Sequence, residues 1–101
     1  MTDKIFAVIR TRGPRWNDSQ PLEGQDDWRL HADFMNGLVT DGFVLLGGPL
    51  EGTPDVLLIV RAVDERQVEE RLAEDCWAAQ DLLRIRQISP WSLRLRLHSD
   101  P

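Results

Sequence analysis

The sequence predicts a single α+β domain in which two helices alternate with short β-strands. The chain has 101 residues, which is enough for one domain with a modest core. Hydrophobic residues make up 42% of it and charged residues 29%, the balance of an ordinary globular protein. Short β-branched runs alternate with segments whose apolar residues recur every three or four positions. We therefore expect one domain over residues 1–101, with residues 98–101 as a flexible tail.

The first half of the chain is expected to contain a strand, a long loop and a helix. Residues 4–10 form an apolar, β-branched run that predicts a strand. Residues 11–24 are rich in glycine, proline and small polar residues, which indicates a loop, and a long loop in a small domain is often functional. A helix is expected from about residue 25 to residue 40, and Gly42, two residues later, is well placed to end it. One face of this helix carries Trp28, His31, Ala32, Met35, Leu38 and Val39.

The second half is expected to contain a hairpin, a second helix and a last strand. Residues 43–50 and 55–62 predict two strands, and the short link between them favours an antiparallel pair. Asp64 has the character of an N-cap, with Gln67 three residues later as in a capping box, and the helix is expected over residues 65–74. Residues 83–88 predict a fourth strand. Ser89 and Pro90 interrupt it, and residues 91–97 are expected to resume it as a final strand or extension.

This β-α-β-β-α-β order is that of the ferredoxin-like arrangement, an antiparallel sheet with both helices on one face. Two helices cover only one side of such a sheet. The alternation along the strands places apolar residues such as Phe6, Val8, Leu45 and Leu57 on opposite sides from their neighbours. We therefore expect the uncovered face to pack against a second copy of the chain.

Composition excludes several classes of function. The net charge of −5 argues against a nucleic-acid partner. Cys76 is the only cysteine and no histidine cluster accompanies it, so we expect neither a disulfide nor a metal or other cofactor. The start of the chain lacks a signal-like apolar run, and no segment approaches the ~20 apolar residues that span a bilayer. These features predict a cytoplasmic protein without a membrane partner.

His31 is the main candidate for a catalytic residue. It lies on the apolar face of the first predicted helix, where a buried imidazole needs a hydrogen-bond partner, and histidine titrates close to neutral pH. Asp75 falls near the inward line of the second predicted helix, so the two side chains can meet. A carboxylate that holds one ring nitrogen fixes the tautomer and makes the other a better base. The alternative is a satisfied core histidine and a solvated carboxylate at a helix end.

Other residues have two interpretations each. Gly47 and Gly48 either let a ligand approach the backbone or mark a bend at a strand end. Trp16 either folds down from the long loop as a lid or packs as an anchor. Cys76 is expected to be an inert thiol, because Asp75 beside it discourages a thiolate. The remaining tryptophans are expected in the core or in a dimer interface: Trp28, Trp77 and Trp91.

Three stretches of the chain share a pattern with one known family. They are Gly13-Pro14-x-Trp16…Pro21-Leu22…Gln25…Trp28-x-x-His31-Ala32-x-Phe34-Met35…Gly42-Phe43-Val44…Gly47-Gly48-Pro49-Leu50, then Leu72-Ala-Glu-Asp75-x-Trp77, then Ile88-x-Pro90-Trp91. In these residues the chain resembles the YCII-related (YciI-like) proteins of the dimeric α/β-barrel superfamily. The resemblance implies a ferredoxin-like protomer whose sheet packs face to face in a homodimer, and a pocket that holds His31 and Asp75.

The resemblance also implies a kind of chemistry. Relatives in the wider superfamily include small isomerases, lyases and monooxygenases that act on aromatic or lactone compounds, often without metal. We therefore expect a cofactor-independent acid–base enzyme of isomerase or lyase type, with His31 and Asp75 catalytic and Trp16, Gly47 and Gly48 contacting a small organic substrate. The alternative is a non-catalytic small-molecule-binding or accessory dimeric module.

The chain departs from the family at one position beside the predicted site. The family usually has proline after the aspartate, where this chain has Cys76. A proline restricts the backbone of the residue before it. We therefore expect the carboxylate of Asp75 to be less firmly placed here than in the family.

Overall fold

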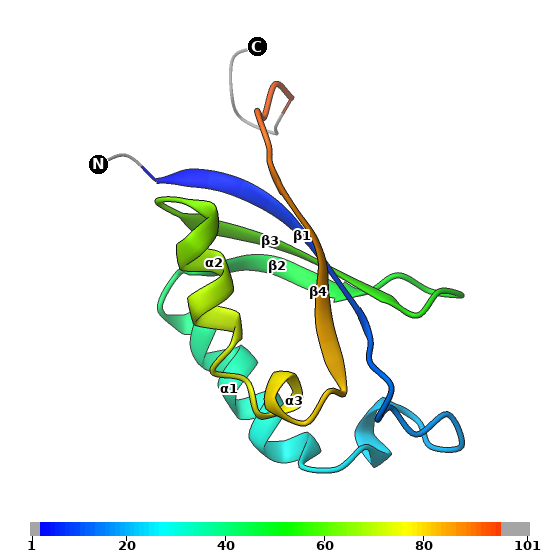
Figure 1. Cartoon of the computed structure of the whole chain (residues 1–101). Helices are drawn as coiled ribbons and strands as arrows, with labels where there is room; N and C mark the ends of the chain where they lie inside the picture. Colours follow the sequence, from blue (N-terminus) through cyan, green and yellow to red (C-terminus); the bar gives the residue numbers. More distant parts are fainter. Residues whose placement is uncertain (1–2, 96–101) are drawn as a thin grey trace.

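The structure, a computed structural model, describes residues 3–95, which form a four-stranded antiparallel sheet with three α-helices on one face (Figure 1). The elements are β1 (Lys4–Arg12), the 3-10 helix η1 (Leu22–Gly24), α1 (Trp28–Thr40), β2 (Val44–Pro49), β3 (Asp55–Ala62), α2 (Glu65–Leu72), α3 (Cys76–Ala79) and β4 (Leu83–Pro90). The strand order is β2-β3-β1-β4, and every neighbouring pair is antiparallel. This α+β architecture is compatible with the predicted ferredoxin-like arrangement, with one helix more than expected.

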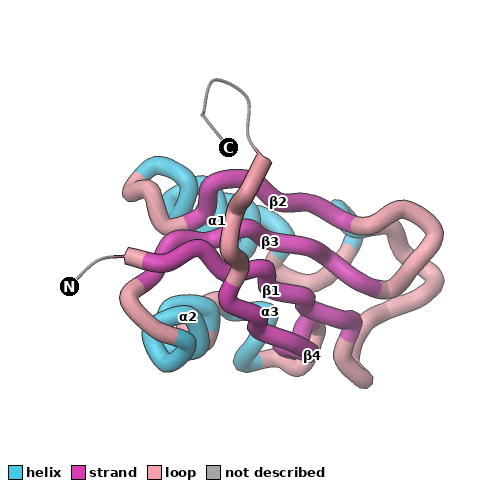
Figure 2. The backbone as a smooth tube through the Cα atoms, turned by 90° about the horizontal axis from the view of Figure 1, so that it is seen from above, coloured by secondary structure: helices cyan, strands magenta, loops and turns pink. Residues whose placement is uncertain are grey.

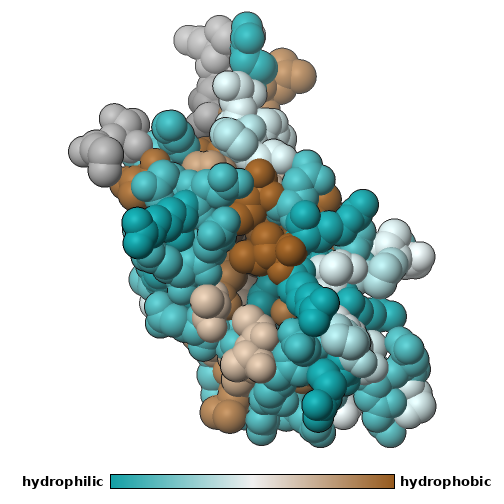
Figure 3. All heavy atoms as spheres, in the orientation of Figure 1, coloured by the Kyte–Doolittle hydropathy of each residue, from teal (hydrophilic) through white to brown (hydrophobic). Residues whose placement is uncertain are grey.

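The core lies between the sheet and the helices. Alternate residues of β1 point toward the helices: Phe6 and Val8 are buried there and lie beside Val60 and Leu58 of β3. One apolar cluster fills this layer: Phe6, Val8, Leu38, Phe43, Val44, Leu58, Val60, Ala62, Val68 and Leu72. A second cluster lies around α3 and consists of Trp77, Leu82 and Leu83 with Trp16, Leu22, Trp28 and Cys76 against it. Figure 3 shows hydrophobic atoms reaching the surface between α2 and β4.

The opposite face of the sheet has no helix over it. Figure 2 views the molecule from above, with the strands in front of the helices. The register pairs Ile9 with Leu57 and Ala7 with Ile59 on this face, and Ile59 pairs in turn with Leu46 of β2. Leu46 is 65% exposed. The prediction that apolar residues lie on both faces of the sheet is therefore confirmed.

The helix α1 begins at Trp28, three residues later than predicted. The preceding Gln25 is buried and its side chain bonds to the backbone of the long loop, so it belongs to that loop. The predicted apolar face was also one residue too wide. Leu38 is 3% exposed, whereas Val39 is 52% exposed. Adjacent residues lie about 100° apart around a helix, so Leu38 faces the core while Val39 points to solvent.

The helix α2 begins as predicted. The side chain of Asp64 accepts a hydrogen bond from the Gln67 backbone N–H at 2.8 Å, which confirms the N-cap. The Gln67 side chain accepts from the backbone N–H of Val63 at 2.8 Å, one residue before the cap that a capping box uses.

The helix was predicted to continue to residue 74, but α2 ends at Leu72 and a separate short helix, α3, follows. Asp75 is therefore the N-cap of α3 and not a residue of the second helix: its side chain accepts from the Trp77 backbone N–H at 3.0 Å. The Asp75 N–H donates to Leu72 O across the turn between the two helices. Asp75 therefore marks the start of a new helix after α2 has ended. The helical periodicity of apolar residues does not reveal such a boundary.

The strands differ from the prediction mainly at their ends. The strand β3 has the predicted bounds, β1 continues two residues further to Arg12, and β2 is one residue shorter at each end. The last strand, β4, continues through Ser89 and Pro90 instead of being interrupted there.

The predicted final strand over residues 91–97 is wrong for the part that the structure describes. Residues 91–95 have no regular structure, although the Trp91 N–H still donates to Ile5 O at 2.8 Å. The last pair between β1 and β4 is Phe6 with Pro90, and a proline has no backbone N–H to donate to the partner strand. This segment leaves the sheet on the side away from the helices (Figure 1). Residues 96–97 of the predicted strand and the predicted tail of 98–101 lie outside the described residues.

Candidate active site

His31 and Asp75 are in contact on the helix side of the sheet, as predicted. Nδ1 of His31 lies 2.8 Å from Oδ2 and 3.0 Å from Oδ1 of Asp75. His31 is 8% exposed and Asp75 is 0% exposed. When Nδ1 donates its proton to the carboxylate, Nε2 carries the lone pair of the neutral ring. Within residues 3–95 no group hydrogen-bonds to Nε2, so this nitrogen is available to a bound molecule.

Arg10 is a third member of the cluster, and it was not predicted. Its Nη1 lies 2.9 Å from Oδ2 of Asp75, and the residue is 1% exposed. Arg10 is the last residue of the predicted strand and continues the inward row of Phe6 and Val8, so period-2 alternation along β1 could have identified it. A buried guanidinium and a buried carboxylate offset each other's charge.

Asp75 is held as an anion by its neighbours. Burial raises the pKa of its carboxyl, but the hydrogen bonds from His31 and from the Trp77 N–H, together with the charge of Arg10, lower it further than burial raises it. The pKa of Asp75 therefore lies below its ordinary range. An anionic carboxylate on Nδ1 fixes the ring tautomer and stabilises the imidazolium that forms when Nε2 takes up a proton.

Trp77 fixes the plane of the His31 ring. The two rings stack with centroids 3.8 Å apart and planes within 5° of parallel. The Trp77 Nε1–H donates to Asp26 O at 2.6 Å, just before α1 begins. Gln80, the residue after α3, donates to the side chain of Asp27 at 2.9 Å. These bonds tie α3 to the residues just before α1, so the elements that carry Asp75 and His31 are fixed relative to each other.

Asp75 is held by its own contacts, with cysteine and not proline after it. Its backbone has φ −69° and ψ 130°, the extended region that a following proline would impose. Three N–H donors hold its carboxylate, and the expectation that the family holds this side chain more firmly stays a prediction. Burial raises the pKa of the Cys76 thiol, and the charges of Asp75 and Asp27 raise it further. This direction agrees with the interpretation of Cys76 as an inert thiol.

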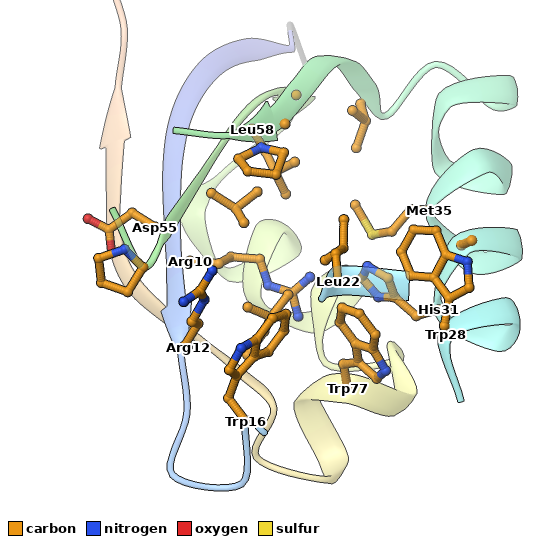
Figure 4. A pocket seen from close by; sticks show the side chains of 18 of the residues that line it. Arg10, Arg12, Trp16, Leu22, Trp28, His31, Met35, Asp55, Leu58 and Trp77 are labelled. Atoms are coloured by element: carbon orange, nitrogen blue, oxygen red, sulfur yellow. The ribbon is translucent and has the colours of Figure 1, made fainter. Parts of the chain in front are cut away.

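A pocket of about 600 Å³ lies between α1 and the sheet and is bordered by His31. Figure 4 shows His31, Trp28 and Met35 on the α1 side, with Arg10 and Arg12 reaching in from β1. Its apolar walls consist of Trp16, Leu22, Trp28, Ala32, Met35, Val44, Val56, Leu58, Trp77 and Leu83. Asp75 lies behind the His31 ring and does not line the pocket. A largely apolar cavity with a few polar groups is the usual form of a small-molecule site.

Trp16 is an anchor that also forms a wall of the pocket. Its ring meets Trp77 edge to face, with centroids 5.6 Å apart and an interplanar angle of 87°. The loop that follows is held by the buried Gln25 amide, which accepts from the Asn17 N–H at 2.9 Å and donates to the Asn17 carbonyl at 2.8 Å. The long loop is thus tied into a fixed shape.

The two glycines of β2 both line the pocket, but they differ in what surrounds them. A Cβ at Gly47 would lie 2.5 Å from a Leu58 methyl and 3.1 Å from the Leu57 carbonyl oxygen, so a larger residue would displace the Leu58 side chain. A Cβ at Gly48 would meet nothing within 4 Å. Packing therefore explains Gly47, and contact of either glycine with a substrate stays a prediction.

The described residues contain neither a cluster of metal-binding side chains nor a membrane-spanning helix. Across residues 3–95, no three His, Cys, Asp or Glu side chains are grouped to hold a metal ion. In the same part of the chain, no helix is both long and apolar enough to cross a membrane.

Comparison with known proteins found no relative: no family model, no curated protein and no solved structure matches the chain. The fold and site define an α+β domain with a buried arginine–aspartate–histidine cluster beside an apolar pocket. The resemblance to the YCII-related proteins stays a prediction from the sequence motifs.

Proposed function

We propose that the protein is a cofactor-independent acid–base enzyme of isomerase or lyase type that acts on a small organic substrate, aromatic or lactone, through His31 and Asp75. One observation carries this proposal. A buried, anionic Asp75 binds Nδ1 of His31, and the same ring borders a pocket large enough for a small molecule. General bases of this kind typically contribute about 10²–10⁴-fold to a rate.

A single base of this kind suffices for two reactions. In an isomerisation, Nε2 takes a proton from one carbon, the electron pair of the broken C–H bond moves the double bond, and Nε2–H returns the proton to another carbon. In an elimination, the same pair forms a double bond to the adjacent carbon, the leaving group departs from that carbon with the electron pair of its bond, and Nε2–H passes the proton to the departing group or to water. In both, Asp75 stabilises the imidazolium and Trp77 holds the ring in place.

Replacing His31 with glutamine is expected to slow carbon-proton exchange by about 10²–10⁴-fold, because it removes the base. The experiment incubates unsaturated lactones and aryl ketones with the protein in D₂O and follows deuterium incorporation by NMR. It detects proton removal even where no net product forms. Arg29→Gln is the control, since it introduces glutamine at an exposed position of the same helix outside the pocket and should leave exchange unchanged.

Equal exchange in wild type and His31→Gln, with both folded, would contradict catalysis by His31. The alternative of a non-catalytic binding module makes a different prediction. A ligand would then raise the melting temperature of wild type and of His31→Gln alike, without exchange in either.

We also propose that the protein is a YCII-related, ferredoxin-like protomer of a dimeric α/β barrel. The strand order β2-β3-β1-β4 supports the ferredoxin-like topology. The apolar sheet face without helices supports pairing with a second copy, since water-exposed apolar patches of this kind mark interfaces.

Light scattering at micromolar concentration is expected to give about twice the chain mass of 11.6 kDa. Leu46→Glu is expected to give a monomer, because Leu46 is 65% exposed on the proposed interface. The matched control is Leu30→Glu, since Leu30 is 60% exposed on α1, on the other side of the sheet. A monomeric wild type would contradict the dimer, as would a Leu46→Glu variant that stays dimeric.

A further inference from the structure

Arg12, at the end of β1, brings a free positive charge to the pocket. It is one of the residues that line the pocket, and its guanidinium carbon lies 4.8 Å from the centroid of the Trp16 ring. This cation–π contact holds the side chain over the wall of the pocket. Among residues 3–95, no hydrogen bond or ion pair engages the guanidinium, so all of its N–H donors are available to a ligand.

The other fixed charges at the pocket are compensated. Arg10 is paired with Asp75 at 2.9 Å. Asp55 is paired with Arg86 at 2.8 Å. Arg12 is therefore the uncompensated fixed charge of the described pocket lining, in a chain whose net charge is −5. A positive pocket in an acidic protein favours entry of an anion.

Arg10 lies two residues before Arg12 in the inward row of β1, and Figure 4 shows its side chain directed from β1 into the pocket toward His31. Its Nε is buried and has no hydrogen-bond partner within the described part of the chain. A water-sized molecule does not reach this atom, so a ligand oxygen of similar size does not reach it either. Arg12 is therefore the arginine whose free donors a ligand in the pocket can meet.

We propose that the pocket binds a small organic carboxylate whose anionic group accepts hydrogen bonds from Arg12. The apolar body of the ligand lies against Leu22, Met35 and Val56. The planar fork of a guanidinium matches a carboxylate in two parallel bonds. This carboxylate is the substrate of the proposed enzyme only if that enzyme function is correct. Binding of the carboxylate does not depend on it and is measured without the reaction.

NMR titration with phenylacetate and its neutral amide, phenylacetamide, tests the charge requirement. We expect phenylacetate to bind wild type at least about tenfold more tightly than the amide, and Arg12→Gln to remove most of this preference. Arg12→Lys keeps the charge but loses the fork, so it should fall between the two. Arg29→Gln is the matched control, since it makes the same charge change at an exposed position of α1 outside the pocket.

The outcomes separate this inference from the enzyme proposal. Loss of carboxylate binding in Arg12→Gln, with binding retained in Arg29→Gln and in His31→Gln, supports the carboxylate site even where no proton exchange occurs. Equal binding of acid and amide overturns it, as does an Arg12→Gln variant that binds phenylacetate like wild type. Absence of phenylacetate binding to wild type, or a preference for inorganic phosphate over phenylacetate, also overturns it.

Discussion

Replacing Asp75 with alanine is expected to lower the free energy of unfolding by about 3–5 kcal/mol. The variant leaves the guanidinium of Arg10, which is 1% exposed, without its counter-ion. It also removes the acceptor of His31 Nδ1 and the N-cap of α3. Loss of an N-cap typically lowers the free energy of unfolding by about 1 kcal/mol. Urea denaturation at neutral pH, followed by far-UV circular dichroism, measures the change.

A second variant distinguishes loss of the charge pair from loss of packing. In Arg10→Met/Asp75→Ala the buried cation is absent, so the double variant is expected to be more stable than Asp75→Ala alone. The exposed pair of Arg66 with Glu70 is the matched control, because breaking it with Glu70→Ala should change stability little. A double variant less stable than Asp75→Ala would show that the charge pair is not what Asp75 contributes.

The effect of Asp75 is also expected to depend on pH in one direction. Its pKa is lowered from the ordinary value of 3.8, so the folded protein keeps the carboxylate ionised to lower pH than the unfolded chain does. The stabilisation is fully present above the ordinary value and is lost as the pH falls through the lowered one. The difference in unfolding free energy between wild type and Asp75→Ala should therefore narrow as the pH falls below about 4. A difference that widens there would contradict the assignment.

The sequence predicted the meeting of His31 and Asp75, but for a reason that was only half right. The helical period placed His31 correctly on the buried face of α1. Asp75 was extrapolated along a helix that ends at Leu72, and it reaches the site as the cap of α3. A helix of four residues contains about one turn and so carries no periodic signal.

Two other features depended on pairing that a single strand does not reveal. The end of β4 depends on its pairing with β1, because the last pair is Phe6 with Pro90 and proline has no backbone N–H to donate. The inward position of Arg10 could have been predicted from the sequence, because Arg10 continues the alternation of Phe6 and Val8 along β1. A charged residue at an inward position needs a buried counter-ion, and that counter-ion comes from residue 75, far along the chain.

Replacing Trp77 with alanine is expected to lower the free energy of unfolding by about 3–5 kcal/mol, as for other large side chains removed from a core. Trp77 is 0% exposed and heads the fully buried side chains by volume. Its loss opens a cavity beside His31, and it removes the Nε1–H bond to Asp26. Urea denaturation measures the loss, and Trp91→Ala is the matched control, since Trp91 is 46% exposed and its loss should have a small effect.

Trp77→Phe separates the ring from the hydrogen bond. Phenylalanine keeps an aromatic surface for His31 to stack on but cannot donate to Asp26, so we expect a loss of stability between those of Trp91→Ala and Trp77→Ala. If the stack positions the imidazole, Trp77→Phe should retain most of the His31-dependent proton exchange, whereas Trp77→Ala should lose it at temperatures where the variant is still folded. A Trp77→Ala variant as stable as Trp91→Ala would contradict the assignment of Trp77 to the core. A folded Trp77→Ala variant with full exchange would show instead that Asp75 alone is sufficient to orient the ring of His31.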